Sequence, residues 1–434
     1  MNALDLFYIP LALVTAPLWA GKKRHGWAER FGKIEALPPR AKGVKRVMLH
    51  AVSVGEVSAL RALVPMLARE CEVVVSATTD TGLARARELF GAMREPSHDA
   101  AEPRHAVYVV RYPLDFSWSV RRVLDAVMPD AVALVELEVW PNFVRACINR
   151  KIPIAVINGR LSPRSFKGYR RARVLLRPTF ARLTRVAAQD EHYAARFEAM
   201  GVARDRIEIA GSMKWDAARI EDQVAGADEL ARELGVDRAV PVVVAGSTAE
   251  AVGEPEEALI VRAARAAAER AGTRVQVLCA PRKPDRFDQA AAAMPGCVRR
   301  TQSKGDRATA SSDLFLLDTI GELRKAYALA DVVVMGRSFG TLYGSDPIEP
   351  AALGKPTLIG PRFGDFEQIV RAFSREGGVE VVADEAELAN SLTRLLLDPA
   401  ARREMADRAR RCIREHQGAT SRHARLILSL AQNG

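Results

Sequence analysis

The chain is poor in cysteine, and its cysteines form no recognisable pattern. The five of them, Cys71, Cys147, Cys279, Cys297 and Cys412, are widely separated, and no C-x-x-C pair occurs. This distribution argues against a disulfide framework and a zinc site, and it suits a reducing compartment. Hydrophobic residues make up 48% of the chain and charged residues 27%, which excludes wholesale disorder.

Several motifs that identify common enzyme classes are missing. The sequence has no P-loop lysine motif, no G-x-S-x-G elbow and no H-E-x-x-H helix. A nucleoside triphosphatase, a serine hydrolase and a zinc peptidase are therefore disfavoured. There is also no internal repeat with the period of a solenoid.

The sequence lacks an apolar run long enough to span a bilayer. The uncharged stretch Leu6–Gly21 has 16 residues and contains Pro10 and Pro17, whereas a spanning helix needs roughly 20. Basic residues follow the stretch instead of preceding it, unlike in a secretory signal. We expect residues 1–33 to associate with a membrane surface or insert shallowly, with the following domains in the cytoplasm. A buried first helix is the alternative.

The chain is basic, and its segment from residue 159 to residue 185 contains no acidic residue. The net charge is +11, which calls for nucleic acid, an acidic membrane or a phosphorylated substrate as partner. Nucleic acid fits less well, because few aromatic residues and no nucleic-acid motif accompany the charges. A solvated helix is the plain alternative. Nine basic residues lie between positions 159 and 185: Arg160, Arg164, Lys167, Arg170, Arg171, Arg173, Arg177, Arg182 and Arg185.

Short β-branched runs alternate with longer helical patterns, which is typical of βαβ units. With 434 residues, the chain is too long for one core. The pattern predicts an α/β protein with two Rossmann-like domains, whose ligand loops meet at a shared cleft. We assign residues 34–219 to the first domain, 220–413 to the second, and 414–434 to a C-terminal helix that packs back on the first. The strands are expected at 44–52, 71–78, 131–138, 152–158, 185–189, 240–247, 274–281, 314–318, 331–336 and 356–360.

The stretch "HAVSVGE", residues 50–56, ends a predicted strand and opens a predicted helix. Ser53-x-x-Glu56 fits a capping box, in which both side chains satisfy free N–H groups of the helix start. A glutamate at the carboxyl end of a strand is also well placed to be a catalytic base. The residues alone leave both interpretations of Glu56 open.

Two further segments combine carboxylates with strand ends. "VELEVWPN" carries Glu136 and Glu138 two residues apart, so on a strand both would point to one face. Such a pair would bind sugar hydroxyls or orient an arginine, or else form a charge-paired strand end. "LLDTIGEL" places Asp318, Gly321 and Glu322 in a strand-to-helix turn.

The segment from residue 336 to residue 361, "GRSFGTLYGSDPIEPAALGKPTLIGP", is the most informative. Its glycines permit close approach of a ligand. Asp346, Pro347 and Glu349 fit the N-cap, N1 and N3 positions of a helix whose free N–H groups would bind phosphate. Glu349 would accept bonds from ribose hydroxyls or complete a capping box. The segment "APRKPDRF" adds Arg282, Lys283 and Arg286 after a strand, as partners for phosphate or carboxylate.

Taken together, these segments resemble the 3-deoxy-D-manno-octulosonic acid (Kdo) transferases of lipopolysaccharide synthesis, a family with the GT-B glycosyltransferase fold. The resemblance spans nearly the whole chain. Its matching segments are "RFG" at residues 30–32, "HAVSVGE", "ELEVWPN", "INGRLS", "AQDEHYAARFEAMG", "GSMKWD", "APRKPDRF", "LLDTIGEL" and "SDPIEPAALGKPTLIGP".

The resemblance implies an inverting transfer of Kdo from CMP-Kdo to a lipid A precursor at the cytoplasmic face of the bacterial inner membrane. It implies no cofactor, no metal ion at the site and no nucleic-acid partner, and it makes Glu56 the general base. The acceptor side and cleft would comprise Ser53, Gly55, Glu136, Glu138 and Arg160. The donor would meet Arg282, Lys283, Asp318, Gly321, Glu322, Ser338, Gly340, Ser345, Asp346 and Glu349.

The chain departs from the family pattern in the donor loop. Family members usually have Gly-Gly-His-Asn-Pro where this chain has Gly344-Ser345-Asp346-Pro347, and Gly-Gly where it has Gly336-Arg337. A His-Asn site after "IGP" is replaced by Arg362 and Asp365. Two alternatives follow from these changes. One is a GT-B isomerase or hydrolase of nucleotide sugars, and the other is a catalytically impaired protein that binds lipid A.

Overall fold

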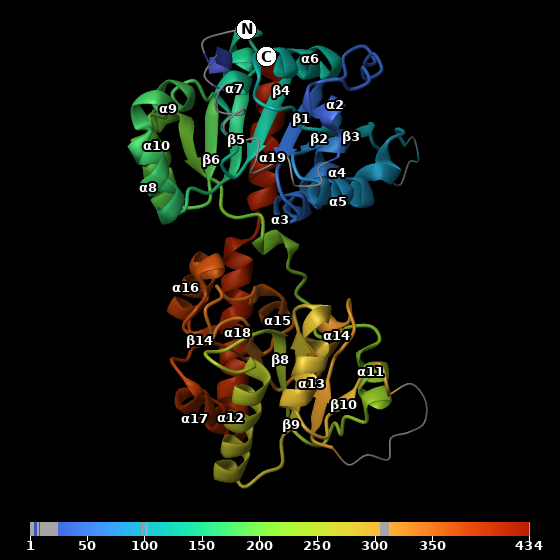
Figure 1. Ribbon diagram of the computed structural model, residues 1–434, viewed down its shortest axis with the longest axis vertical. Coiled ribbons are helices and arrows are strands. Elements are labelled where there is room, and N and C mark those ends of the chain that lie inside the picture. The colour runs from blue at the N-terminus through green and yellow to red at the C-terminus, as the bar shows by residue number, and fades with distance from the viewer. Residues whose placement is uncertain are drawn as a thin grey trace. The chain divides into compact units, whose positions relative to one another are not determined.

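The computed structural model describes residues 4–6, 8, 25–97, 99, 103–303 and 312–433, and the chain forms two compact units (Figure 1). The first unit contains Met1–Ala217 and His416–Gly434, and the second contains Ala218–Glu415. The boundaries expected at 219/220 and 413/414 lie two residues from this division. The apolar stretch expected to meet a membrane lies, except for Leu6 and Tyr8, outside the described residues. Within the described part, no helix is both long and apolar enough to cross a membrane.

The first unit is built on a seven-stranded sheet in which all neighbouring strands are parallel. In spatial order its strands are β3 (Val107–Arg111), β2 (Glu72–Ala77), β1 (Arg46–Ala51), β4 (Ala131–Val135), β5 (Ile154–Gly159), β6 (Arg185–Ala188) and β7 (Ile207–Ile209). Parallel strands align their carboxyl ends, so the loops that follow them meet at one edge of the sheet.

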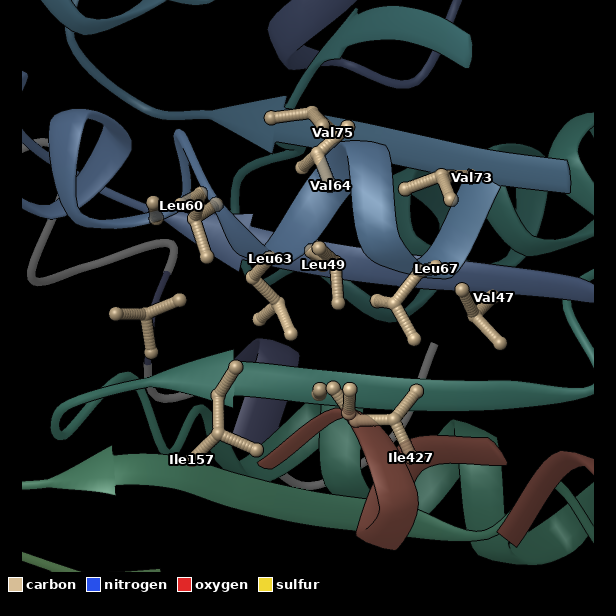
Figure 2. Close-up of a cluster of buried hydrophobic side chains, with 14 of the residues drawn as sticks. Val47, Leu49, Leu60, Leu63, Val64, Leu67, Val73, Val75, Ile157 and Ile427 are labelled. Carbon is tan, nitrogen blue, oxygen red and sulfur yellow. The ribbon is translucent and has the colours of Figure 1, made fainter. Parts of the chain in front are cut away.

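Helices cover both faces of this sheet, as the alternating side chains of its strands require. Val47 and Leu49 of β1 point into one buried cluster, and Met48 points into the cluster on the other face. Figure 2 shows the first cluster, where Leu49 lies between Leu63 and Leu67. Each fully buried side chain of this kind stabilises the fold by about 1.5–3 kcal/mol. The unit's main helices are α2 (Trp27–Arg30), α3 (Val54–Ala59), α4 (Leu63–Ala68), α5 (Asp80–Phe90), α6 (Ser117–Val127), α7 (Pro141–Asn149), α8 (Pro163–Arg171), α9 (Arg173–Phe180) and α10 (Glu191–Met200).

The last helix of the chain, α19 (Ala419–Asn433), belongs to the first unit. Its residues Leu426 and Ile427 are buried in the same cluster as Leu49, and Ile427 appears beside Ile157 in Figure 2. Asp216 accepts hydrogen bonds from the N–H groups of Gly418, at 2.6 Å, and of Thr420. Helix α19 therefore completes the core of the first unit, although it follows the second unit in the sequence.

The second unit repeats the plan with another seven-stranded parallel sheet. Its spatial order is β10 (Val298–Arg299), β11 (Leu314–Leu316), β9 (Gln276–Pro281), β8 (Val242–Thr248), β12 (Val332–Met335), β13 (Thr357–Ile359) and β14 (Val379–Val381). Its helices are α11 (Ala227–Leu234), α12 (Glu256–Ala271), α13 (Phe287–Ala293), α14 (Leu323–Leu329), α15 (Ile348–Ala352), α16 (Glu367–Glu376), α17 (Glu385–Leu397) and α18 (Pro399–His416).

The prediction of two parallel α/β domains is confirmed, and ten of the strands lie where the alternation placed them. The sequence missed β3, β7, β10 and β14, which are the four edge strands of the two sheets. Three of these span only two or three residues. Edge strands are half-covered, so they need no continuous apolar run and leave a weak signal.

Candidate functional site

Glu56 stands at the start of α3, immediately beyond the carboxyl end of β1. Ser53 is the N-cap of α3, and its hydroxyl accepts a bond from the Glu56 N–H at 3.4 Å. The Glu56 carboxylate in turn accepts from the Val52 N–H at 2.8 Å and from the Ser53 hydroxyl at 2.9 Å. Both residues thus take part in a reciprocal cap, as the capping-box interpretation predicted.

The electrostatic surroundings of Glu56 also fit a base. Burial, opposed by the bond from Val52 and reinforced by the charge of Glu136, raises its pKa to about 7. A carboxylate of ordinary pKa is a weak base near neutrality, and one with a pKa near 7 accepts a proton readily there. Capping and basicity are therefore compatible at this one residue.

The prediction that Glu136 and Glu138 point to one face of a strand is wrong. Strand β4 ends at Val135, and Glu136 has a φ of 59°, in the left-handed region that terminates an extended chain. Glu138 is the third residue after the strand, and it accepts a bond from the Trp140 indole at 2.8 Å. Burial and the charge of Glu136 raise its pKa. Both carboxylates nevertheless remain at the carboxyl edge, because their charges act on Glu56.

His50, the last-but-one residue of β1, was not predicted to take part in the site. Its ring is fully buried, stacks on Tyr112 with centroids 3.5 Å apart, and has its pKa lowered to about 3 by burial. Nδ1 lies 3.1 Å from the Ser76 hydroxyl oxygen. Nε2 has no hydrogen-bond partner among the described residues and lies 3.9 Å from Oε2 of Glu138. A neutral imidazole therefore lies close to Glu138. The sequence signal that could have indicated it is its position in "HAVSVGE".

The remaining residues expected on the acceptor side lie at the same edge. The N–H of Arg160, which follows β5, donates to the Glu136 carbonyl at 3.3 Å. A Cβ added to Gly55 would meet only the Ser53 hydroxyl, at 3.9 Å. Packing within the chain therefore does not require this glycine, and it leaves open space beside Glu56.

In the second unit, Glu256 holds the glycine-rich loop in place. Its fully buried carboxylate accepts bonds from the N–H groups of Arg337 at 2.6 Å, Ser338 at 2.8 Å and Phe339 at 3.0 Å, and from Ala249 at 2.8 Å. These loop N–H groups are thus already bonded within the chain. The sequence missed Glu256, because an acid in the first turn of a helix such as α12 is ordinary.

The side chains of the same loop are also largely committed to the fold. The Ser338 hydroxyl donates to the Met335 carbonyl at 2.6 Å and accepts from the Gly360 N–H at 2.8 Å. A Cβ on Gly340 would come within 2.1 Å of the Glu250 carbonyl oxygen, so only glycine fits. Arg337 has a φ of 61°, a conformation that favours glycine.

Asp318 and Glu322, expected among the donor ligands, are ion-paired within the unit. Asp318 accepts from Arg299 Nε at 2.8 Å and from the hydroxyl and N–H of Thr301 at 2.6 and 2.8 Å. Glu322 accepts from the Thr319 hydroxyl at 2.6 Å and from Arg300 Nε at 3.2 Å. These partners outweigh the effect of burial and hold both pKa values below the usual range. Gly321, in the same turn, has a φ of 95° and open space at its Cα.

The loop before α15 differs slightly from its predicted form. The helix begins at Ile348 with Pro347 as N-cap, one residue later than expected, although Asp346 does accept a bond from the Ile348 N–H at 3.0 Å. Burial raises the pKa of Glu349, whose Oε1 lies 3.5 Å from Arg324 Nη1. The Ser345 hydroxyl is buried and has no bonding partner among the described residues.

The basic residues after β9 divide into two kinds. Arg282 and Lys283 are exposed. Arg282, Glu349 and Asp346 all lie close enough to the buried Tyr327 for their charges to act on its pKa, which Arg282 lowers and the two acids raise. Arg286 pairs instead with Glu250 and Glu257. Arg282, Lys283, Ser345 and Glu349 therefore remain the second unit's best candidates for a ligand, at the carboxyl edge of its sheet.

Known proteins resemble the chain in both sequence and fold. The family model for 3-deoxy-D-manno-octulosonic acid transferase matches residues 25–217. A transferase of that name from Bordetella pertussis is 34% identical over 93% of each chain, and one from Haemophilus influenzae is 27% identical over 96% of this chain and 93% of its own.

Two solved structures resemble the chain in fold at low sequence identity. A glycosyltransferase from Rickettsia africae covers 90% of this chain and all of its own with a TM-score of 0.58 at 9% identity. UDP-GlcNAc 2-epimerase from Neisseria meningitidis has the same coverage, with a TM-score of 0.56 at 14% identity. These two-domain neighbours support the GT-B fold. With a relative 34% identical along almost its whole length, the chain belongs to the 3-deoxy-D-manno-octulosonic acid transferase family.

Proposed function

We propose that this chain transfers Kdo from CMP-Kdo to a hydroxyl group of a phosphorylated lipid A precursor, as an inverting glycosyltransferase of lipopolysaccharide synthesis. Membership of the Kdo transferase family supports the reaction. The observation that carries the mechanism is Glu56, a capped carboxylate with a pKa of about 7 at the carboxyl edge of the first sheet.

In the proposed mechanism, Glu56 takes the proton from the attacking hydroxyl. The hydroxyl oxygen forms a bond to the anomeric carbon of Kdo while the bond from that carbon to CMP breaks. The proton moves to the Glu56 carboxylate as the new bond forms, so no free alkoxide accumulates. Glu136 and Glu138 raise the proton affinity of Glu56 by their negative charge.

On the donor side, cations would meet the charge that develops on the leaving CMP. Arg282 and Lys283 are exposed beyond β9, and neither forms an ion pair with any residue that the structure describes. The buried Ser345 hydroxyl and the Glu349 carboxylate would bind the sugar or ribose hydroxyls. Such preorganised partners stabilise a leaving phosphate without a metal ion. The precursor and the donor are both anionic, in keeping with the net charge of +11.

Because the acceptor is a lipid, we place the reaction at the cytoplasmic face of the inner membrane. The apolar composition of residues 6–21 and the three basic residues that follow support this placement.

The test is mass spectrometry of the lipid after incubation with CMP-Kdo and a lipid A precursor. We expect the lipid to gain Kdo, and Glu56→Gln to abolish the gain. No Kdo-bearing lipid would contradict the proposal. Release of free Kdo in the absence of acceptor would favour a hydrolase.

A further inference from the structure

His50 of the first unit has a buried ring nitrogen whose hydrogen-bonding capacity is not used. The side chain is fully buried, and its Nε2 has no hydrogen-bond partner among the residues that the structure describes. Leaving a buried polar atom unbonded is costly, so such an atom in a well-packed sheet needs a reason. Nε2 lies 3.9 Å from Oε2 of Glu138, whose side chain is largely buried at the carboxyl edge.

The other ring nitrogen indicates which tautomer the imidazole adopts. Nδ1 lies 3.3 Å from the carbonyl oxygen of Ser76 and 3.1 Å from its hydroxyl oxygen. A carbonyl oxygen can only accept, and the Ser76 hydroxyl donates its own hydrogen to the Leu49 carbonyl at 3.2 Å. Nδ1 therefore carries the hydrogen of the ring and donates it to Ser76, which leaves a lone pair on Nε2. Burial lowers the pKa of His50 to about 3, so the ring stays neutral.

Nε2 and an ionised Glu138 would both be acceptors, and they can bond only if a proton lies between them. Because the ring stays neutral, that proton belongs to Glu138. Burial and the charge of Glu136 favour this form, since both raise the pKa of Glu138. Oε2 also accepts the Trp140 indole N–H at 2.8 Å, and a protonated Oε2 keeps this bond while it donates to Nε2. A distance of 3.9 Å is longer than a hydrogen bond, but such contacts commonly tighten when substrates bind.

We propose that His50 is a positioning residue for Glu138: its Nε2 accepts a hydrogen bond from the protonated Glu138 carboxyl and holds it in the site as a neutral acid. The proposal rests on the proposed function, in which Glu56 is the base. It adds a residue that acts on Glu56 through Glu138 and does not itself touch a substrate.

A neutral Glu138 changes the charge around the base. Glu136 and Glu138 are the two acids whose charges act on the Glu56 carboxyl. The charge of Glu138 also acts on Tyr112 and Tyr169, and burial raises the pKa of both phenols, so they stay neutral. With Glu138 protonated, only Glu136 adds negative charge beside Glu56. A larger fraction of Glu56 is then ionised at neutral pH, and the edge repels an anionic donor less.

The first test is the tautomer of His50 in the full-length chain, measured without donor or acceptor. Histidines are labelled with nitrogen-15, and long-range proton–nitrogen spectra distinguish Nδ1–H from Nε2–H. The chain has seven histidines, and the signals lost in His50→Asn are those of His50. We expect a neutral Nδ1–H ring from about pH 5 to pH 8. A neutral Nε2–H ring would overturn the proposal, because His50 would then donate to an ionised Glu138.

Two substitutions separate the bond to Ser76 from the bond to Glu138. An asparagine amide reproduces the position of Nδ1, so His50→Asn keeps the donor to Ser76. A glutamine amide reproduces the position of Nε2, so His50→Gln keeps an acceptor for Glu138. The measurement is the initial rate of Kdo transfer against pH.

We expect His50→Asn to move the acid limb of this profile to higher pH by about one unit, because Glu138 then ionises and its charge raises the pKa of Glu56. His50→Gln should leave the acid limb near its original pH, whatever its maximal rate. The opposite order of the two variants would assign His50 to the bond with Ser76 alone and overturn the proposal.

A double substitution shows whether the effect passes through Glu138. In a Glu138→Gln background the side chain at 138 carries no charge, so adding His50→Asn should not move the acid limb further. An undiminished shift in that background would overturn the proposal. The matched control is His423→Asn, because His423 is also fully buried in the first unit and has its pKa lowered to about 4 by burial. It should lower the melting temperature and leave the acid limb in place, and an equal shift of the limb would likewise overturn the proposal.

The two kinds of measurement keep this proposal distinct from the proposed function. If the chain transferred no Kdo, the proposed function would fail, while the tautomer of His50 would still be measured. If the chain transferred Kdo and His50 carried its hydrogen on Nε2, only the role of His50 would fail.

Discussion

The same local motif occurs at the carboxyl edge of both sheets, with different consequences. Ser53-x-x-Glu56 and Thr319-x-x-Glu322 each place a hydroxyl within hydrogen-bonding distance of a glutamate three residues later, at 2.9 and 2.6 Å. Glu322 also meets Arg300 and Lys325, and its pKa is lowered. Glu56 is hydrogen-bonded by neutral donors, and burial raises its pKa to about 7.

The difference shows that the motif alone does not determine the chemistry of its glutamate. Charged partners make Glu322 a structural anion, while burial with neutral donors makes Glu56 a proton acceptor. Glu56 thus stays available to accept a proton, whereas the charge of Glu322 is neutralised within the fold. Substitutions at matched positions test this contrast.

The largest expected effect is on turnover. Glu56→Gln should lower kcat by about 10²-fold or more, because an amide cannot take the proton. Its melting temperature should stay close to wild type, since glutamine serves in a capping box. The matched variant Glu322→Gln should lower the melting temperature and change kcat much less. The contrast between the two glutamates would be contradicted if Glu322→Gln were folded but inactive, or if Glu56→Gln were unfolded.

The next effect is on stability, through Glu256. Glu256→Ala should reduce the free energy of unfolding by about 4 kcal/mol, because several buried N–H groups each lose about 1 kcal/mol or more. Urea denaturation followed by circular dichroism measures it. The neighbouring Glu254 forms a partly exposed ion pair with Arg262, so Glu254→Ala should cost less than about 1 kcal/mol. Similar costs for the two variants would show that Glu256 does not anchor the loop.

The pH dependence of the transfer rate tests the raised pKa of Glu56. With a pKa of about 7, Glu56 is protonated below neutrality and cannot act as a base. The initial rate should therefore fall about tenfold per pH unit below pH 7. Glu136→Gln removes a negative charge that raises this pKa, so the acid limb should move to lower pH. A rate that is independent of pH between 5 and 8, at saturating substrates, would exclude Glu56 as the base.

The smallest effect is the pH dependence of stability in the second unit. The pKa of Asp318 is lowered in the fold, so its contribution is present at neutral pH and is lost as the pH falls through the folded pKa. Asp318→Asn should cost about 2 kcal/mol at pH 7 and less in acid. Glu56 has the opposite sign, because its raised pKa makes folding less favourable as the pH rises from about 4.5 to 7. Thermal melts from pH 3 to 8 separate the two.

Strand alternation was enough to predict the two parallel domains, whereas the role of Glu56 as base stays a prediction. The central strands are continuous apolar runs, since they are buried on both faces, and each predicted one exists. "HAVSVGE" led to Glu56 because a local cap motif is written in consecutive residues. The contacts that the sequence could not indicate join distant segments. No residue next to Asp318 in the sequence indicates that Arg299 and Thr301 are its partners. Likewise, Glu256 lies eighty-one residues from Arg337, whose N–H group it binds.

The conformation of Glu136 was missed for a related reason. Alternation along "VALVELE" extends the strand through both glutamates, but the chain turns into the left-handed region at Glu136. No glycine or asparagine marks the turn. A residue type that rarely adopts this conformation is held in it by its surroundings, which is common at functional sites.

The return of α19 to the first unit also fixes the order of events during synthesis. Leu426 and Ile427 emerge from the ribosome after the whole of the second unit, yet they fill the core beneath β1, β4 and β5. The second unit is contiguous in the chain and can close first. The first unit therefore cannot complete its core before α19 has been made, so a chain that lacks α19 should expose apolar side chains of this core.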